Sequence, residues 1–104
     1  MKPNLSYIDT LAGDDKAFKQ HLISIVKEEL PQEIEVYKRN LSDEKYQDVA
    51  ENVHKLKHKI SILGMEKAYY LAVDYEEELK NNEASQQAAF EAILESMSQF
   101  VNQL

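Results

Sequence analysis

Residues 46–64, "YQDVAENVHKLKHKISILG", predict one amphipathic α-helix. Their apolar residues recur three and four positions apart, as on one face of a 3.6-residue helix; they are Tyr46, Val49, Val53, Leu56, Ile60 and Leu63. Before them, Ser42 with Asp43 and Glu44 suits a cap and an acidic first turn. After them, Gly64 suits either a helix end or a close contact with another helix.

The same spacing continues in both directions from this helix. A long helix before it carries apolar residues from Phe18 to Leu41 in phase across Pro31, so we expect the proline to kink this helix rather than end it. A short helix with Asn4 as its N-cap comes first, and Gly13 ends it. This short helix and the two helices after Gly64 are predicted at about residues 4–11, 66–80 and 84–104.

Four long helices joined by short connections predict an all-α fold, an antiparallel up-down four-helix bundle with a short extra N-terminal helix. The chain has only two glycines and two prolines, too few for a fold of many short strands. Its 104 residues suit one domain, so we expect a single domain over residues 1–104. Because the predicted helices begin close to Met1 and end close to Leu104, we expect a free-standing monomer.

Composition narrows the classes of function. A net charge of -7 disfavours nucleic-acid binding, because phosphates would be repelled. There is no cysteine, which excludes disulfides and thiolate metal sites. No apolar run approaches the roughly 18 residues of a membrane span, and the N-terminus lacks the apolar core of a signal peptide. We therefore expect a cytoplasmic protein that binds neither membrane nor nucleic acid.

His54 is predicted to lie on the solvent face of the helix over residues 46–64. On a helical wheel the buried face is centred about 130° away from it. The residues predicted to share its exposed strip are Gln47, Ala50, Lys57, His58, Ser61 and Met65. Lys57 and His58, three and four positions on, can reach the space above its ring.

Two interpretations of this strip follow from the residue types. A histidine among lysines suits a solvated helix face, the simpler interpretation from spacing alone. Alternatively, an exposed and partly neutral imidazole is a nucleophile. A nearby lysine would not help it act as a base, but would stabilise an anion such as a phosphoryl group placed on the ring.

Residues 54–64, "HKLKHKISILG", resemble the signature of histidine-containing phosphotransfer (HPt) domains. That signature has a histidine, a lysine three residues on, and a leucine–glycine pair nine and ten residues on, which match His54, Lys57, Leu63 and Gly64. Residues 5–34 resemble the family's first two helices. Residues 69–79, "YYLAVDYEEEL", resemble its fourth helix, with Glu76 at a commonly acidic position.

The resemblance implies a phosphorelay protein that needs no cofactor, has no ATP site and does not phosphorylate itself. His54 would accept a phosphoryl group through Nε2 from an aspartate of a receiver domain and pass it to another. The implied partners are receiver domains of response regulators, of a hybrid histidine kinase, or of both. Lys57 would steady the phosphoryl oxygens.

His58 stands where the family usually has glycine. Its imidazole could narrow access, select one receiver or donate a hydrogen bond to the phosphoryl group, and we favour the hydrogen bond. Ser61 keeps the next turn small, and Ala50, Met65 and Lys55 complete the expected docking surroundings. Lys55, Lys57 and Lys59 would raise the local potential toward an acidic receiver pocket, with Lys59 acting only at long range.

The same residues also bear on other functions. His54 and His58 are spaced like zinc ligands, but lysines separate them and no third ligand is evident, so we expect no metal site. An adaptor that binds a partner through exposed Ile62 and Met65 remains the alternative function. The acidic residues Asp74, Glu77 and Glu78 suit a solvated face, the tyrosines mostly suit the core, and His21 receives no role.

Overall fold

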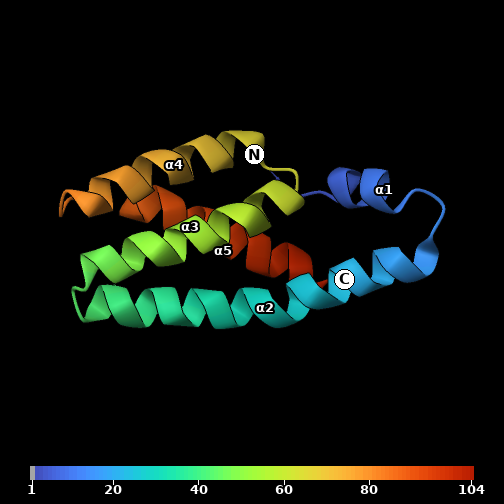
Figure 1. The fold of residues 1–104 in the computed structure, drawn as a ribbon, viewed down its shortest axis with the longest axis horizontal. Helices are drawn as coiled ribbons and strands as arrows, with labels where there is room; N and C mark the ends of the chain where they lie inside the picture. The colour runs from blue at the N-terminus through green and yellow to red at the C-terminus, as the bar shows by residue number, and fades with distance from the viewer. Residues whose placement is uncertain (1) are drawn as a thin grey trace.

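The computed structural model describes residues 2–104. In that range the chain forms five α-helices and no strand, which confirms the all-α prediction (Figure 1). The helices are α1 (Ser6–Ala12), α2 (Lys16–Ser42), α3 (Tyr46–Ile62), α4 (Glu66–Lys80) and α5 (Gln87–Asn102). Within these residues no helix combines the length and the apolar character that crossing a bilayer demands.

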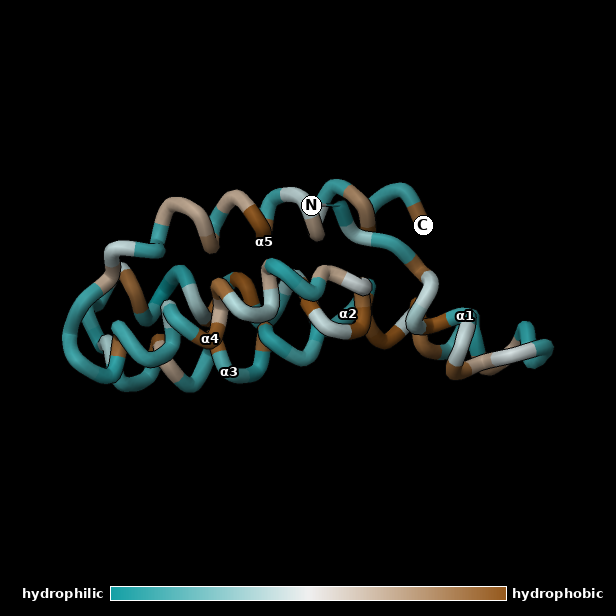
Figure 2. The backbone as a smooth tube through the Cα atoms, turned by 90° about the horizontal axis from the view of Figure 1, so that it is seen from above, coloured by the Kyte–Doolittle hydropathy of each residue, from teal (hydrophilic) through white to brown (hydrophobic). Residues whose placement is uncertain are grey.

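The four long helices run in alternating directions, as an up-down bundle requires (Figure 1). Helix α3 packs against both α2 and α4, and α5 packs against the same two helices. Figure 2 shows α5 on the other side of the bundle from α3. Because α3 is covered on its flanks and toward the core, only its outer face is open to solvent.

Helix α1 packs along the first turns of α2, beyond the end of the other helices (Figures 1 and 2). The molecule is therefore 45 Å long but only 23 Å and 19 Å across. Phe18, which the periodicity assigned to the buried face, is 40% exposed in this overhanging part of α2. Pro31 lies inside α2 and does not end it, as predicted, while the kink stays a prediction.

Helices α2, α3 and α4 end in the same kind of turn, a Schellman motif. In each turn one residue has a positive φ; these residues are Glu44 (56°), Gly64 (73°) and Asn82 (59°). The next N–H then donates to the carbonyl five residues earlier: Lys45 to Asn40, Met65 to Ile60 and Glu83 to Glu78. These bonds satisfy carbonyls that a helix end would otherwise leave without partners.

Two of the predicted helix starts were wrong. Ser42 belongs to α2, and Asp43 is the C-cap of α2, so these residues end one helix instead of capping the next. Lys45 precedes α3 and makes no side-chain cap. Helix α5 begins at Gln87 rather than near residue 84. Before α3, the turn that closes α2 uses the residues assigned to the start of the new helix. Before α5, residues 84–86 form a separate turn, in which the N–H of Gln87 donates to the carbonyl of Ala84 and the N–H of Gln86 donates to Glu78 Oε1.

Gly64 ends α3 as predicted, and its close contact is with the N-terminal segment rather than with a helix. The N–H of Asn4 donates to the carbonyl of Leu63 at 2.8 Å. The N-cap of α1 is Leu5 rather than the predicted Asn4, but the Asn4 side chain still accepts from the N–H of Ser6 at 3.0 Å. A Cβ on Gly64 would lie 2.5 Å from Asn4 Oδ1. The glycine thus allows the N-terminal segment to cross the α3–α4 turn.

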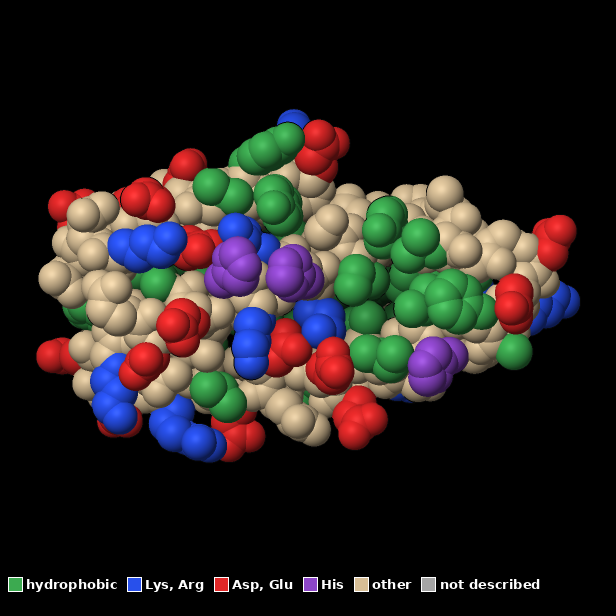
Figure 3. All heavy atoms as spheres, in the orientation of Figure 1, with side chains coloured by type: hydrophobic (Ala, Val, Ile, Leu, Met, Phe, Trp, Pro, Cys, Tyr) green, Lys and Arg blue, Asp and Glu red, His purple; other side chains and the backbone are tan. Residues whose placement is uncertain are grey.

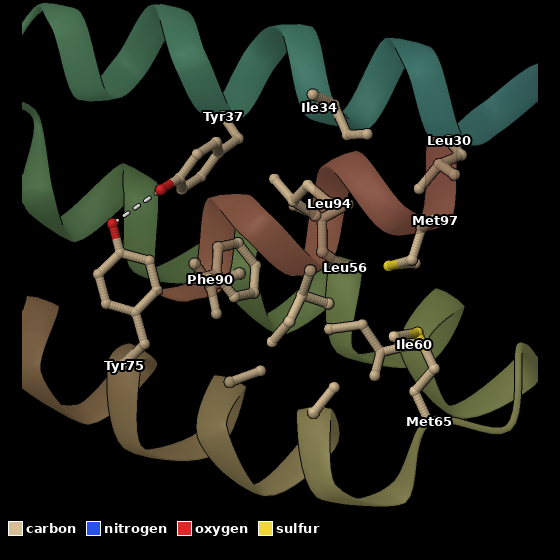
Figure 4. Packing of buried hydrophobic residues seen from close by; sticks show 14 of the residues in the cluster. Leu30, Ile34, Tyr37, Leu56, Ile60, Met65, Tyr75, Phe90, Leu94 and Met97 are labelled. Carbon is tan, nitrogen blue, oxygen red and sulfur yellow. Dashed lines mark hydrogen bonds between the residues drawn. The ribbon is translucent and has the colours of Figure 1, made fainter. Parts of the chain in front are cut away.

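The core is built from apolar side chains of all four long helices (Figure 4). At one end of it the hydroxyls of Tyr37 and Tyr75 share a hydrogen bond of 2.8 Å, with Phe90 packed against both rings. Burial raises the pKa of both phenols. The expected core position is confirmed for these two tyrosines, whereas Tyr7 and Tyr70 are exposed.

Candidate functional site

The outer face of α3 presents His54 and His58. The His54 side chain is 56% exposed, and the two ring centroids lie 5.5 Å apart in an edge-to-face arrangement. Two adjacent histidine side chains are visible near the centre of the face in Figure 3, with lysines and acidic side chains around them. Lys55 and Ser61 are also exposed. The helical wheel therefore placed His54, His58 and Ser61 correctly.

Three other residues of the predicted exposed strip are buried instead. Lys57 is 8% exposed, Ala50 3% and Met65 2%, and Ile62 is half-buried. Packing against α2 and α4 buries a wider arc of α3 than its apolar stripe alone covers. The prediction that Lys57 and Met65 face solvent was wrong for this reason, and an adaptor surface built on Met65 loses that residue.

Glu76 of α4 lies beneath the His54 ring and contacts three basic side chains. His54 Nδ1 is 3.3 Å from Glu76 Oε2 and 3.4 Å from Oε1. Lys57 Nζ is 2.9 Å from Oε1, and Lys80 Nζ is 3.5 Å from Oε2. The Glu76 side chain is only 12% exposed, so these basic groups take the place of water around the carboxylate.

The charged state of Glu76 follows from these contacts. Burial by itself raises the pKa of the carboxyl, but the Lys57 ammonium and His54 outweigh it, so the pKa lies below its ordinary value. Glu76 is therefore a carboxylate at neutral pH. A carboxylate that accepts a hydrogen bond from Nδ1 favours the tautomer with the proton on Nδ1 and leaves the lone pair on Nε2.

Lys59 does not add to the positive potential of this face. Its Nζ is 2.8 Å from Glu29 Oε1 and 3.0 Å from Glu33 Oε2, both on α2. Burial lowers the pKa of the ammonium, but the two carboxylates raise it above its ordinary value, so Lys59 stays charged. Two negative charges around one positive charge cancel its field. The expected long-range contribution of Lys59 was wrong for this reason.

Two hollows flank the histidines. One is lined by Gln47, Ala50, Glu51, His54, Lys55, Glu76 and Lys80, and the other by Tyr7, His58, Ser61, Gly64, Glu66, Tyr69 and Tyr70. The first, here called the polar hollow, is lined mostly by polar and charged residues, which surround the His54 ring. The second is rich in aromatic side chains, two of which, Tyr7 and Tyr70, are exposed. Among residues 2–104 no group of three or more acidic, histidine or cysteine side chains could hold a metal ion.

Two residues at the site were missed from the sequence. Glu76 was noted only as an acidic position, and Lys80 was not considered. Both are on α4, and they are four positions apart, the spacing of a helical ion pair. That spacing was a usable signal, but only the packing of α4 on α3 shows that the pair lies beside His54.

Comparison with known proteins gave one match. A family model described as the Hpt domain matches residues 21–103, which include the whole of α3, α4 and α5 and most of α2. Searches among curated proteins and among solved structures found no match.

Proposed function

Because the chain belongs to the Hpt domain family, we propose that His54 accepts a phosphoryl group from one receiver-domain aspartate and passes it to another. Hpt domains are phosphotransfer modules of two-component phosphorelays, lack kinase activity and interact with receiver domains. The family match supports this role for the chain. The assignment to His54 and the transfer between two receivers are our proposal.

The observation that carries the proposal is the contact between His54 Nδ1 and Glu76 on an otherwise exposed ring. With its proton held on Nδ1, the ring offers the Nε2 lone pair to solvent. Nε2 attacks the phosphorus of an aspartyl phosphate, the Nε2–P bond forms, and the P–O bond to the aspartate breaks. The aspartate leaves as a carboxylate, and the ring becomes an imidazolium that retains its Nδ1 proton beside the Glu76 carboxylate.

The same contact serves the return reaction. When an aspartate of the second receiver attacks the phosphorus, the N–P bond breaks and its electron pair returns to Nε2. No proton needs to move, because Glu76 has held the Nδ1 proton throughout. A carboxylate that stabilises the imidazolium in both directions suits a relay, whose histidine must both gain and lose the phosphoryl group.

The remaining predicted residues surround this centre. His58 and Ser61 lie on the exposed side, where a receiver would approach, and Lys55 borders the polar hollow. Ala50 and Met65 are buried and support the face from below. The role of Lys57 at the phosphoryl oxygens stays a prediction, since its ammonium contacts Glu76 in this structure.

The test is phosphoryl transfer from a phosphorylated receiver domain. Acid-labile phosphate is expected on the wild type and absent from His54→Gln, while His21→Gln serves as the histidine-removal control. Circular dichroism must show that all variants fold alike. Label on His54→Gln would contradict the assignment. Unlabelled wild type that still binds the receiver would favour the adaptor function.

A second arm of the same experiment tests the source of the phosphate. Incubation with γ-labelled ATP alone is expected to give no label on His54, because we propose that the phosphoryl group arrives only from a receiver. Labelling by ATP in the purified protein would overturn this part of the proposal. A phosphorylated receiver added in a parallel sample shows that the protein is competent.

A further inference from the structure

Two lysines contact the Glu76 carboxylate, and they differ in how much of the side chain is exposed to solvent. The Lys57 side chain is 10% exposed and that of Lys80 is 50% exposed. The Lys57 contact is also the shorter, 2.9 Å against 3.5 Å. One lysine is therefore a buried partner of Glu76, whereas the other is a half-exposed cation at the edge of the site.

Lys57 is held in place from two sides. Its Nζ contacts Glu76 Oε1 and lies 5.7 Å from the centroid of the Tyr69 ring. Drawing this ammonium out to a phosphoryl group would remove the closest cation from a carboxylate that is almost buried. Separating a buried ion pair is unfavourable because each charge has lost its water. This arrangement fits a residue that keeps Glu76 charged and in position.

Lys80 is placed differently. Its Nζ lies 3.5 Å from Glu76 Oε2, the same oxygen that is 3.3 Å from His54 Nδ1, so Nζ is at most 6.8 Å from Nδ1. Lys80 also lines the polar hollow beside the His54 ring. A half-exposed lysine can change rotamer with little loss of burial, and its four-carbon stem gives it reach.

We propose that Lys80 is the lysine that binds the phosphoryl oxygens when His54 is phosphorylated, while Lys57 is a positioning residue that acts through Glu76. This inference rests on the proposed function of His54. A phosphoryl dianion attracts an ammonium more strongly than a carboxylate already shared by two other basic groups. Lys80 would therefore exchange its long contact with Glu76 for charge-assisted hydrogen bonds to the phosphoryl group.

The experiment uses phosphoramidate, a small donor that needs no receiver, and follows the product by phosphorus NMR. A neighbouring ammonium favours the dianionic phosphoryl group and lowers its second pKa. In Lys80→Gln we expect that pKa to be about 0.5–1 higher than in the wild type, and phosphorylation to be about five- to tenfold slower. Lys80→Arg keeps the positive charge, so its phosphoryl pKa and its rate of phosphorylation are both expected to be close to those of the wild type.

The matched control is Lys67→Gln, which removes the charge of another exposed lysine from the same helix, outside the lining of the hollow. It should titrate like the wild type. Glu51 and Lys55 also border the hollow and act on the phosphoryl group, but they are unchanged in every variant, so the comparison isolates Lys80.

The outcomes separate the two proposals. If His54 is phosphorylated but Lys80→Gln titrates and reacts like the wild type, the role of Lys80 is wrong and the proposed function stands. The role of Lys80 is also wrong if Lys57→Met folds and raises the phosphoryl pKa while Lys80→Gln does not. If neither phosphoramidate nor a phosphorylated receiver labels His54 in the wild type, both proposals fail.

Discussion

At the scale of single residues, Glu76 serves folding and chemistry with one side chain. Its carboxylate joins α4 to α3 through Lys57 and sets the orientation of the His54 ring through Nδ1. A glutamate that only paired charges could lie anywhere along the interface. Glu76 lies where its second oxygen can accept a hydrogen bond from the Nδ1 proton of the His54 ring. A change at position 76 should therefore affect both the stability of the fold and the reactivity of His54.

Glu76→Gln is expected to lower the free energy of unfolding at neutral pH by about 3 kcal/mol, because it leaves the buried Lys57 ammonium without its charged partner. Denaturation with urea measures this. Adding Lys57→Met to Glu76→Gln removes the unpaired charge and should recover much of the loss. A double variant as unstable as the sum of the two single variants would show that the pair contributes little.

Comparison of the wild type with Glu76→Gln also tests how the stability of the fold depends on pH. The pKa of Glu76 is lower in the folded protein than its ordinary value of 4.5, so its stabilising contribution is present above that pH and is lost as the pH falls through the folded-state pKa. On acidification from about pH 7 to about pH 3, the wild type should therefore lose more stability than Glu76→Gln. Parallel curves for the two proteins would contradict this sign.

The site could be predicted from the sequence only where it lies on one helix. The exposure of His54, His58 and Ser61 follows from spacing within α3. The burial of Lys57 and the approach of Lys80 depend on how α4 packs against α3, and no pattern within residues 46–64 contains that information. Side chains that act from a neighbouring helix are the part that spacing cannot supply.

At the scale of elements, the turns decide where the helices end. The positive φ of Gly64 and Asn82 is easily adopted by glycine and asparagine, but Glu44 takes the same conformation with a side chain that disfavours it. Glycine at position 64 is a residue type that signals a helix end, and the end of α3 was predicted correctly. Glutamate at position 44 is no such signal, and the residues around it were assigned to the wrong helix.

Glu44→Gly is expected to raise the free energy of unfolding by about 0.5 kcal/mol, since the relief of left-handed strain is partly offset by the greater freedom of glycine in the unfolded chain. Thermal and urea denaturation would both detect it. Asn82→Gly is the matched comparison, and its gain should be smaller because asparagine tolerates this conformation. A loss of stability in Glu44→Gly would show that the glutamate side chain stabilises the turn.

At the scale of the whole molecule, the histidines lie between a polar hollow and an aromatic one. Exposed Tyr7 on α1 and exposed Tyr70 on α4 line the same hollow as His58. Figure 3 shows hydrophobic side chains gathered on the side of the histidines toward the overhanging end of the molecule. Helix α1 lies beyond the end of the bundle, so the overhanging end of the molecule lengthens the surface beside the site. A partner that approaches His54 would meet charge on one side and apolar side chains on the other.

Tyr70→Ser is expected to slow transfer from a phosphorylated receiver by up to about tenfold, because an exposed aromatic side chain beside the site supplies binding energy to a partner. Its reaction with phosphoramidate should be unchanged, since that donor is too small to reach Tyr70 and His54 together. Val73→Ser, at another exposed apolar position of α4 that lies outside the lining of the aromatic hollow, is the control. Slowing in both assays would place the effect in the fold rather than in docking.

The buried pair of Tyr37 and Tyr75 also gives the protein an optical reporter. The chain has no tryptophan, so its near-ultraviolet absorbance and emission come almost entirely from tyrosine. Two of the six phenols are enclosed and share a hydrogen bond, and they become hydrated only when the core opens. Absorbance difference spectra can therefore follow unfolding without a label, and phosphate chemistry at an imidazole, which adds no chromophore, can be monitored separately in the same sample.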